Sequence, residues 1–130
     1  MAHTILVVDD DDDFLLQMRL QLQARGYEVV TAASAAEARA ALAARRPDLV
    51  IADLMMEVPD AGFSLCYEIK RQDPTIPVIM ATAVGSATGI SFDVETEEER
   101  AWIKADSVLP KPLRVEQLER EMRRLLKDQD

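Results

Sequence analysis

Short apolar runs alternate along the chain with longer segments in which apolar residues are spaced differently. The runs hold three to five residues and are rich in Val, Ile and Leu, which is typical of strands covered on both faces by helices. In the longer segments apolar residues recur every three or four positions, the spacing of one helix face. The runs that predict strands are Ile5–Val8, Glu28–Ala32, Leu49–Ala52, Val78–Ala81 and Ser107–Leu109.

The segments between these runs carry helix start and stop signals. Ser34 is a good N-cap for an Ala-rich helix, and Gly26 ends the helix before it. Glu57–Gly62 is turn-like, and Ala83–Phe92 is rich in Gly, Ser and Thr, which indicates a loop. The segments that predict helices are Phe14–Leu22, Ala35–Ala44, Phe63–Asp73, Thr96–Ile103 and Val115–Leu126.

Strand and helix patterns thus alternate through the whole chain with no repeat or linker between them. This order predicts parallel strands joined by right-handed helical crossovers, in a doubly wound α/β domain. We expect residues 1–130 to form this single domain, with no output domain. In the third helix we place Cys66 and Tyr67 on the inner side, with Phe63 and Ile69.

Polar side chains follow four of the predicted strands. Asp9 and Asp10 follow the first, Asp53 the third, Thr82 the fourth and Lys111 the fifth. Because parallel strands end at the same edge of a sheet, we expect these side chains to meet there, where open α/β sheets bind ligands. Considered singly, each has an ordinary interpretation: a helix cap, a strand-end hydroxyl or a solvated lysine.

The acidic run after the first strand points to a cation. Carboxylates that converge at one edge repel one another, and a small hard cation such as Mg²⁺ relieves that repulsion. We assign this chemistry to Asp9 and Asp10 only. Asp12 and Asp13 precede a helical pattern, and acids suit the positive end of a helix dipole.

Composition narrows the class of protein. The chain has 24 acidic and 15 basic residues, a net charge of −9, which argues against direct binding to nucleic acid or to an anionic membrane. With one cysteine, Cys66, no internal disulfide forms, and residues 1–4 have no signal-peptide pattern. We therefore expect a cytoplasmic protein.

Four stretches at these strand ends resemble the receiver domain of bacterial two-component response regulators, and the resemblance covers nearly the whole chain. It implies a flavodoxin-like fold of five parallel strands in the order 2-1-3-4-5, with helices on both faces. The stretches are Val7–Asp10, Pro47–Met56, Pro77–Ala83 and Lys111-Pro112.

The resemblance also implies roles for single residues. Asp53 matches the phosphoacceptor, Thr82 the switch hydroxyl and Lys111 the lysine that contacts the phosphoryl group. Phosphorylation of a carboxylate depends on positioning and on neutralising the charge of the phosphoryl oxygens, and these residue types suit that task. The domain is then a signalling switch and not a classical enzyme.

A Mg²⁺ cofactor is the second implication of the resemblance. Asp9 and Asp10 match the metal-binding acids, Asp53 adds an oxygen, and Met55 matches the position whose backbone carbonyl also binds the metal. The loop from Met56 to Gly62 is longer than is usual in the family, so this chain departs from the pattern beside Met55.

Two other departures concern the readout of phosphorylation. Val108 stands where the family commonly has an aromatic switch residue, and the stretch from Thr82 to Lys111 is longer than usual. With no aromatic at 108, residues 85–102, which include Phe92 and Trp102, are our candidate for the element that changes state.

The partners that the resemblance implies are a sensor histidine kinase or a histidine phosphotransfer protein as donor, and a downstream protein as target. It also admits a homodimer linked to phosphorylation.

Two alternatives come from other classes of protein. Asp9 and Asp11 have the spacing of the acids of a haloacid-dehalogenase-like phosphohydrolase, although Asp13 departs from that motif. A receiver-like module that binds partners without phosphorylation is the other.

Overall fold

The computed structural model describes residues 3–53, 61–82, 106–110 and 113–127. Strands and helices alternate through these residues, as the hydrophobic pattern predicts. In chain order the elements are β1 (Thr4–Val8), α1 (Asp12–Ala24), β2 (Glu28–Ala32), α2 (Ala35–Ala44), β3 (Leu49–Asp53), α3 (Ala61–Gln72), β4 (Val78–Thr82), β5 (Ser107–Pro110) and α5 (Val115–Lys127).

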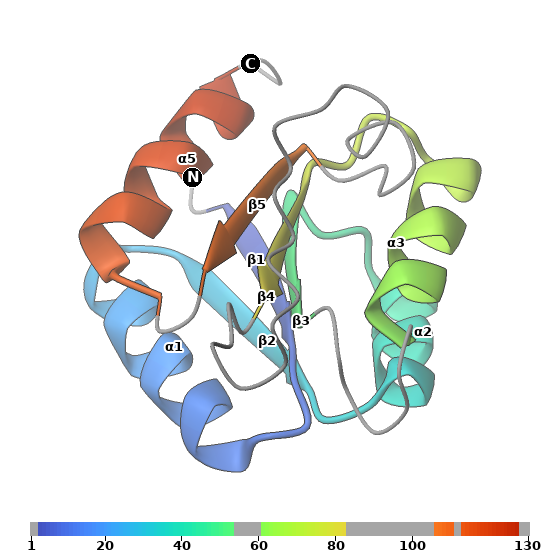
Figure 1. The fold of residues 1–130 in the computed structure, drawn as a ribbon, viewed down its shortest axis with the longest axis horizontal. Helices are drawn as coiled ribbons and strands as arrows, with labels where there is room; N and C mark the ends of the chain where they lie inside the picture. Colours follow the sequence, from blue (N-terminus) through green and yellow to red (C-terminus); the bar gives the residue numbers. More distant parts are fainter. Residues whose placement is uncertain (1–2, 54–60, 83–105, 111–112, 128–130) are drawn as a thin grey trace, which may run out of the picture.

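The five strands form one parallel sheet in the order β2-β1-β3-β4-β5. The predicted fold is therefore confirmed, including the strand order. Helices α1 and α5 cover one face of the sheet, and α2 and α3 cover the other (Figure 1). The chain leaves β1 toward β2 on one side and returns to β3 on the other, so a topological switch point lies between β1 and β3.

The core consists of two layers, one on each face of the sheet. Strand residues alternate between them: Leu6 and Val8 of β1 pack toward α2 and α3, whereas Ile5 and Val7 pack toward α1 and α5. Strands β1 and β3 are buried along their whole length, because helices cover both of their faces. These two central strands therefore give the end of the sheet that carries the acids a rigid base.

The predicted boundaries of the helices that the structure describes, α1, α2, α3 and α5, are correct to within a few residues. The Ser34 hydroxyl accepts a hydrogen bond from the Glu37 N–H at 3.1 Å, as expected for the N-cap of α2. Gly26 follows α1 with φ of +92°, a left-handed conformation that glycine adopts without strain. The predicted loop Ala83–Phe92 and helix Thr96–Ile103 lie outside the described residues.

Two details of the third helix were predicted wrongly. Gly62 lies inside α3 and not in a turn. Glycine in a helix costs about 1 kcal/mol, and the burial of Leu65, Cys66 and Ile69 by this helix outweighs that cost. Tyr67 is 54% exposed, not on the inner side. The buried positions Leu65 and Ile69 are four residues apart, and this phase turns Tyr67 outward.

Candidate functional site

Asp9 and Asp53 lie at the same level of two neighbouring strands. Val8 is paired with Ala52 in the register of β1 and β3, and Asp9 and Asp53 are the residues that follow this pair. The Asp9 N–H donates to the Ala32 carbonyl at 3.1 Å, which continues the bonding of β1 to β2 by one residue. The acids thus sit at the switch point, the usual ligand-binding place of this fold.

Asp9, Asp10 and Asp53 form one cluster of carboxylates. Each offers an oxygen, and these oxygens all lie within 4.8 Å of one another. Asp9 is 0% exposed and Asp53 7%, whereas Asp10 is open to solvent. The cluster therefore has a buried base of two acids and an accessible rim.

The turn from β1 into α1 fixes the base of this cluster. The Asp11 N–H donates to Asp9 Oδ1 at 3.0 Å, which holds the Asp9 carboxylate. The Asp11 carboxylate is the N-cap of α1 and accepts from the Asp13 and Phe14 N–H groups at 3.0 and 3.3 Å. Asp12 and Asp13 occupy the first turn of the helix, as predicted. The five acids thus divide into a site pair, a cap and a helix start.

The chemistry of this cluster suits a small hard cation. Two full charges on Asp9 and Asp53 within 4.8 Å of each other would repel by about 3.5 kcal/mol or more at an effective dielectric constant near 20. Carboxylate oxygens are the donors that Mg²⁺ and Ca²⁺ prefer, and Mg²⁺ is commonly held by one or two of them together with waters. The residues present therefore fit a bound divalent cation.

The other predicted site residues are placed only in part. Thr82 is the last residue of β4 and lies in register with Pro110 of β5, so its backbone is at the same edge of the sheet as Asp53. Met55 and Lys111 lie outside the described residues. Lys111 is the residue that follows Pro110 in the chain.

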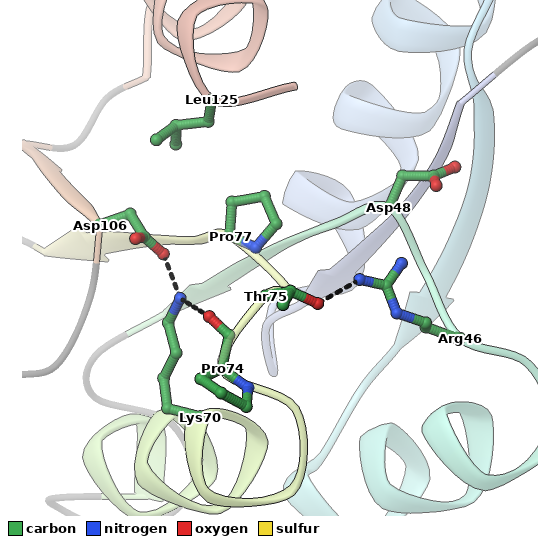
Figure 2. Close-up of a pocket in the computed structure, with 8 residues that line it drawn as sticks. All are labelled: Arg46, Asp48, Lys70, Pro74, Thr75, Pro77, Asp106 and Leu125. Carbon is green, nitrogen blue, oxygen red and sulfur yellow. Dashed lines mark hydrogen bonds and ion pairs between the residues drawn. The ribbon is translucent and has the colours of Figure 1, made fainter. Parts of the chain in front are cut away.

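A second group of charged residues, at the opposite edge of the sheet, was not predicted. Asp48, Lys70 and Asp106 line a cavity of about 650 Å³ at the amino ends of β3, β4 and β5 (Figure 2). Asp48 and Asp106 each come directly before a strand, which is the one signal that the sequence offers. Nothing in the local pattern connects Lys70 of α3 with Asp106, because the two are far apart along the chain.

The fold and the acid cluster together define a class of protein, a doubly wound α/β domain with an acidic site at its switch point. Comparison with known families gives the particular family. The family model of the response regulator receiver domain matches residues 5–123, and the chain belongs to this family. The family identified from its motifs is thereby confirmed. Receiver domains are signalling proteins and not classical enzymes.

Individual relatives agree with this assignment. The chain is 37% identical over 123 residues to a probable transcriptional regulator, ycf27, of Cyanophora paradoxa, and the match covers 95% of the chain and 48% of that protein. The chain thus spans about half the length of this relative. Within the described residues, no helix has the length and apolar character needed to cross a membrane.

Solved structures show the same fold. A putative response regulator from Chloroflexus aurantiacus is 30% identical, with a TM-score of 0.81 and coverage of 98% of this chain and 99% of the other. The response regulator TrrA from Thermotoga maritima, solved in complex with Mg²⁺ and BeF, is 26% identical, with a TM-score of 0.77 and coverage of 96% and 99%.

Proposed function

We propose that the protein is a phosphorylation-dependent switch that accepts a phosphoryl group on Asp53. The observation that carries this proposal is the cluster in which Asp53 shares a buried base with Asp9, beside the exposed Asp10, at the switch point of the sheet. A sensor histidine kinase or a histidine phosphotransfer protein is the proposed donor. In the transfer, the P–N bond to the donor histidine breaks and a P–O bond to Asp53 forms.

The residues of the chain act by positioning and by charge. Asp53 is held at the end of a fully buried strand, so its carboxylate presents one oxygen to the phosphorus without a search through conformations. Asp9 and Asp10, with the backbone carbonyl of Met55, are the proposed ligands of Mg²⁺. When bound, Mg²⁺ supplies positive charge against the phosphoryl oxygens. The complex of TrrA with Mg²⁺ and BeF supports this cofactor.

Thr82 and Lys111 are the proposed contacts of the phosphoryl group. Thr82 ends β4 next to Asp53 of β3, because Asp53 is paired with Ala81. Lys111 is the residue directly after β5, and we propose that its ammonium group stabilises the negative charge of the phosphoryl oxygens. Each residue thus belongs to a different strand end of one sheet edge.

The proposal extends to the setting of the domain. We infer a single receiver domain over residues 1–130 that works in the cytoplasm, reports to a downstream protein partner and does not bind nucleic acid directly. Because position 108 holds valine and not an aromatic residue, we propose residues 85–102 as the element that reads out phosphorylation; they lie outside the described residues. A homodimer that forms on phosphorylation is a further proposed form of output. The haloacid-dehalogenase-like alternative needs Asp11 as its acid, and the engagement of the Asp11 carboxylate in the cap of α1 argues against that role.

Intact mass after incubation with acetyl phosphate and Mg²⁺ tests the phosphorylation. We expect one added phosphoryl group on the parent chain and none on Asp53→Asn. EDTA should prevent the addition. A mass gain on Asp53→Asn equal to that of the parent would contradict the assignment of Asp53, and turnover of a phosphate monoester would favour the phosphohydrolase.

A further inference from the structure

Strand β5 is a short edge strand whose far end belongs to the proposed site. It has four residues and, among the described strands, pairs with β4 alone, with Ile79 opposite Ser107 and Thr82 opposite Pro110. Pro110 has no N–H to donate to β4, so the N–H groups that this strand can donate to the sheet come from residues nearer its start. A strand held by so few bonds is weakly fixed in register unless something else secures it.

Asp106, directly before β5, is held twice against the start of β4. Its N–H donates to the Val78 carbonyl at 2.9 Å, and its carboxylate accepts from the Val78 N–H at 2.8 Å. Asp48, directly before β3, makes the same pair of contacts with Thr4 of β1, at 2.8 and 2.7 Å. At the amino ends of β3 and β5, an aspartate directly before the strand thus binds both backbone groups of a residue in the neighbouring strand. We call each such pair of contacts a clamp.

At β5, unlike β3, a lysine is added to the clamp. Lys70 Nζ lies 2.5 Å from the Asp106 carboxylate oxygen that also accepts from Val78, and it donates to the Ile76 carbonyl at 2.7 Å. Figure 2 shows the Lys70 side chain rising from α3 to meet Asp106, with the Pro74 carbonyl, 3.5 Å away, as a further acceptor. The lysine side chain is largely buried, so the ion pair is only partly screened by solvent.

The position of this clamp sets the register of the whole strand. Because side chains of a strand alternate between faces, a slip of one residue would exchange the two faces of β5 and move its end past Thr82. Four residues of strand span only about 13 Å, so a shift at Asp106 is carried along the strand to Pro110.

We propose that Lys70 and Asp106 are positioning residues for phosphoryl transfer. They act from the amino ends of the strands, whereas the carboxylate cluster lies at the carboxyl ends. They hold β5 in register with β4 and so fix Pro110, which is paired with Thr82 and is the residue directly before Lys111 in the chain. This inference rests on the proposed function. The inference separates two parts of the site, because Asp9 and Asp10 follow β1 and Asp53 ends β3, so their placement does not depend on β5.

Two measurements on the same variants test this separation. Lys70→Met keeps the stem of the side chain and removes the charge, and Asp106→Asn keeps an acceptor for the Val78 N–H. Arg71→Met is the matched control, since Arg71 is the next residue of α3, is exposed and has no ion pair within the described residues. The rate of phosphorylation by acetyl phosphate is compared with the dissociation constant for Mg²⁺, measured by calorimetry without a phosphodonor.

We expect Lys70→Met and Asp106→Asn to slow phosphorylation on the order of tenfold, since a displacement of about 1 Å can slow catalysis about 100-fold. The Mg²⁺ affinity should stay within about twofold, and Arg71→Met should match the parent in both. Hydrogen exchange at the Leu109 amide should be faster in these two variants and unchanged in Arg71→Met. The variant that combines Lys70→Met and Asp106→Asn should be phosphorylated no more slowly than either single variant, because the two residues act as one unit.

Unchanged phosphorylation in both clamp variants would overturn the inference and leave Asp53 as the acceptor. An equal loss of Mg²⁺ affinity and of phosphorylation would also overturn it, because the pair would then support the whole domain and not β5. A parent protein that is not phosphorylated at all would instead overturn the proposed function.

Discussion

The carboxylates of Asp9 and Asp53 come from adjacent buried strands and offer oxygens within 4.8 Å of each other. Two such acids repel each other in the folded chain and separate when the chain unfolds. Their proximity is therefore unfavourable for the fold by itself and becomes favourable once a cation lies between them.

This relationship predicts opposite effects of Mg²⁺ and of charge removal on stability. Adding Mg²⁺ should raise the melting temperature of the parent, because the ion binds the folded acids. Asp53→Asn should melt higher than the parent in EDTA, since one repelling charge is gone, and should gain less from Mg²⁺. Differential scanning calorimetry measures both, and a lower melting temperature of Asp53→Asn in EDTA would contradict the repulsion.

The cap of α1 can be tested separately from the acid site. Asp11→Ala removes the acceptor of the Asp13 and Phe14 N–H groups, so we expect a loss of about 1 kcal/mol in the free energy of unfolding. Asp12→Ala, one residue further, should lose at most a few tenths of that through the helix dipole. Urea unfolding measures both; equal losses would mean that the cap is not special.

Two leucines of α1 allow a test of how much the core layer between α1 and the sheet contributes to stability. Leu22 is 0% exposed, whereas Leu20 is 59% exposed on the same helix. Leu22→Ala should reduce the free energy of unfolding by about 2 to 5 kcal/mol, the usual range for a buried leucine. Leu20→Ala, as matched control, should change it by about 0.5 kcal/mol or less. Chemical denaturation with an unchanged m-value is the measurement.

Asp73 predicts a dependence on pH. Hydrogen bonds from Thr75 and Arg46 lower the pKa of its carboxyl from 3.8 to about 2. A lowered folded pKa means that the stabilisation is complete above the unfolded pKa and disappears as the pH falls through about 2. Asp73→Asn should therefore destabilise the protein at pH 7, and this effect should disappear as the pH falls below about 2. An NMR titration of Asp73 checks the pKa directly, and Thr75→Val should raise it.

The acid site could be predicted because its residues follow strands whose hydrophobic pattern is clear in the sequence. A run such as Leu49–Ala52 indicates a buried parallel strand, and parallel strands must end at one edge, so Asp9 and Asp53 are brought together by topology alone. No long-range contact had to be known. The same reasoning fixes the backbone of Thr82.

The clamp could not be predicted, for the converse reason. In the sequence Lys70 looks like any other basic residue of a helix, and its partner Asp106 comes directly before a distant strand. The packing of α3 against the sheet brings the two together. The face of Tyr67 failed in a related way, since the phase of a short helix depends on which residues reach the sheet.

Cys66 lies 0% exposed in the layer between the sheet and α3, and burial raises the pKa of its thiol to about 11. A thiol that stays protonated and enclosed reacts with an alkylating reagent only when α3 opens from the sheet. Since the chain has one cysteine, labelling under native conditions follows a single event. The native protein therefore carries its own reporter of how often the α3 side of the core opens, with no probe to introduce.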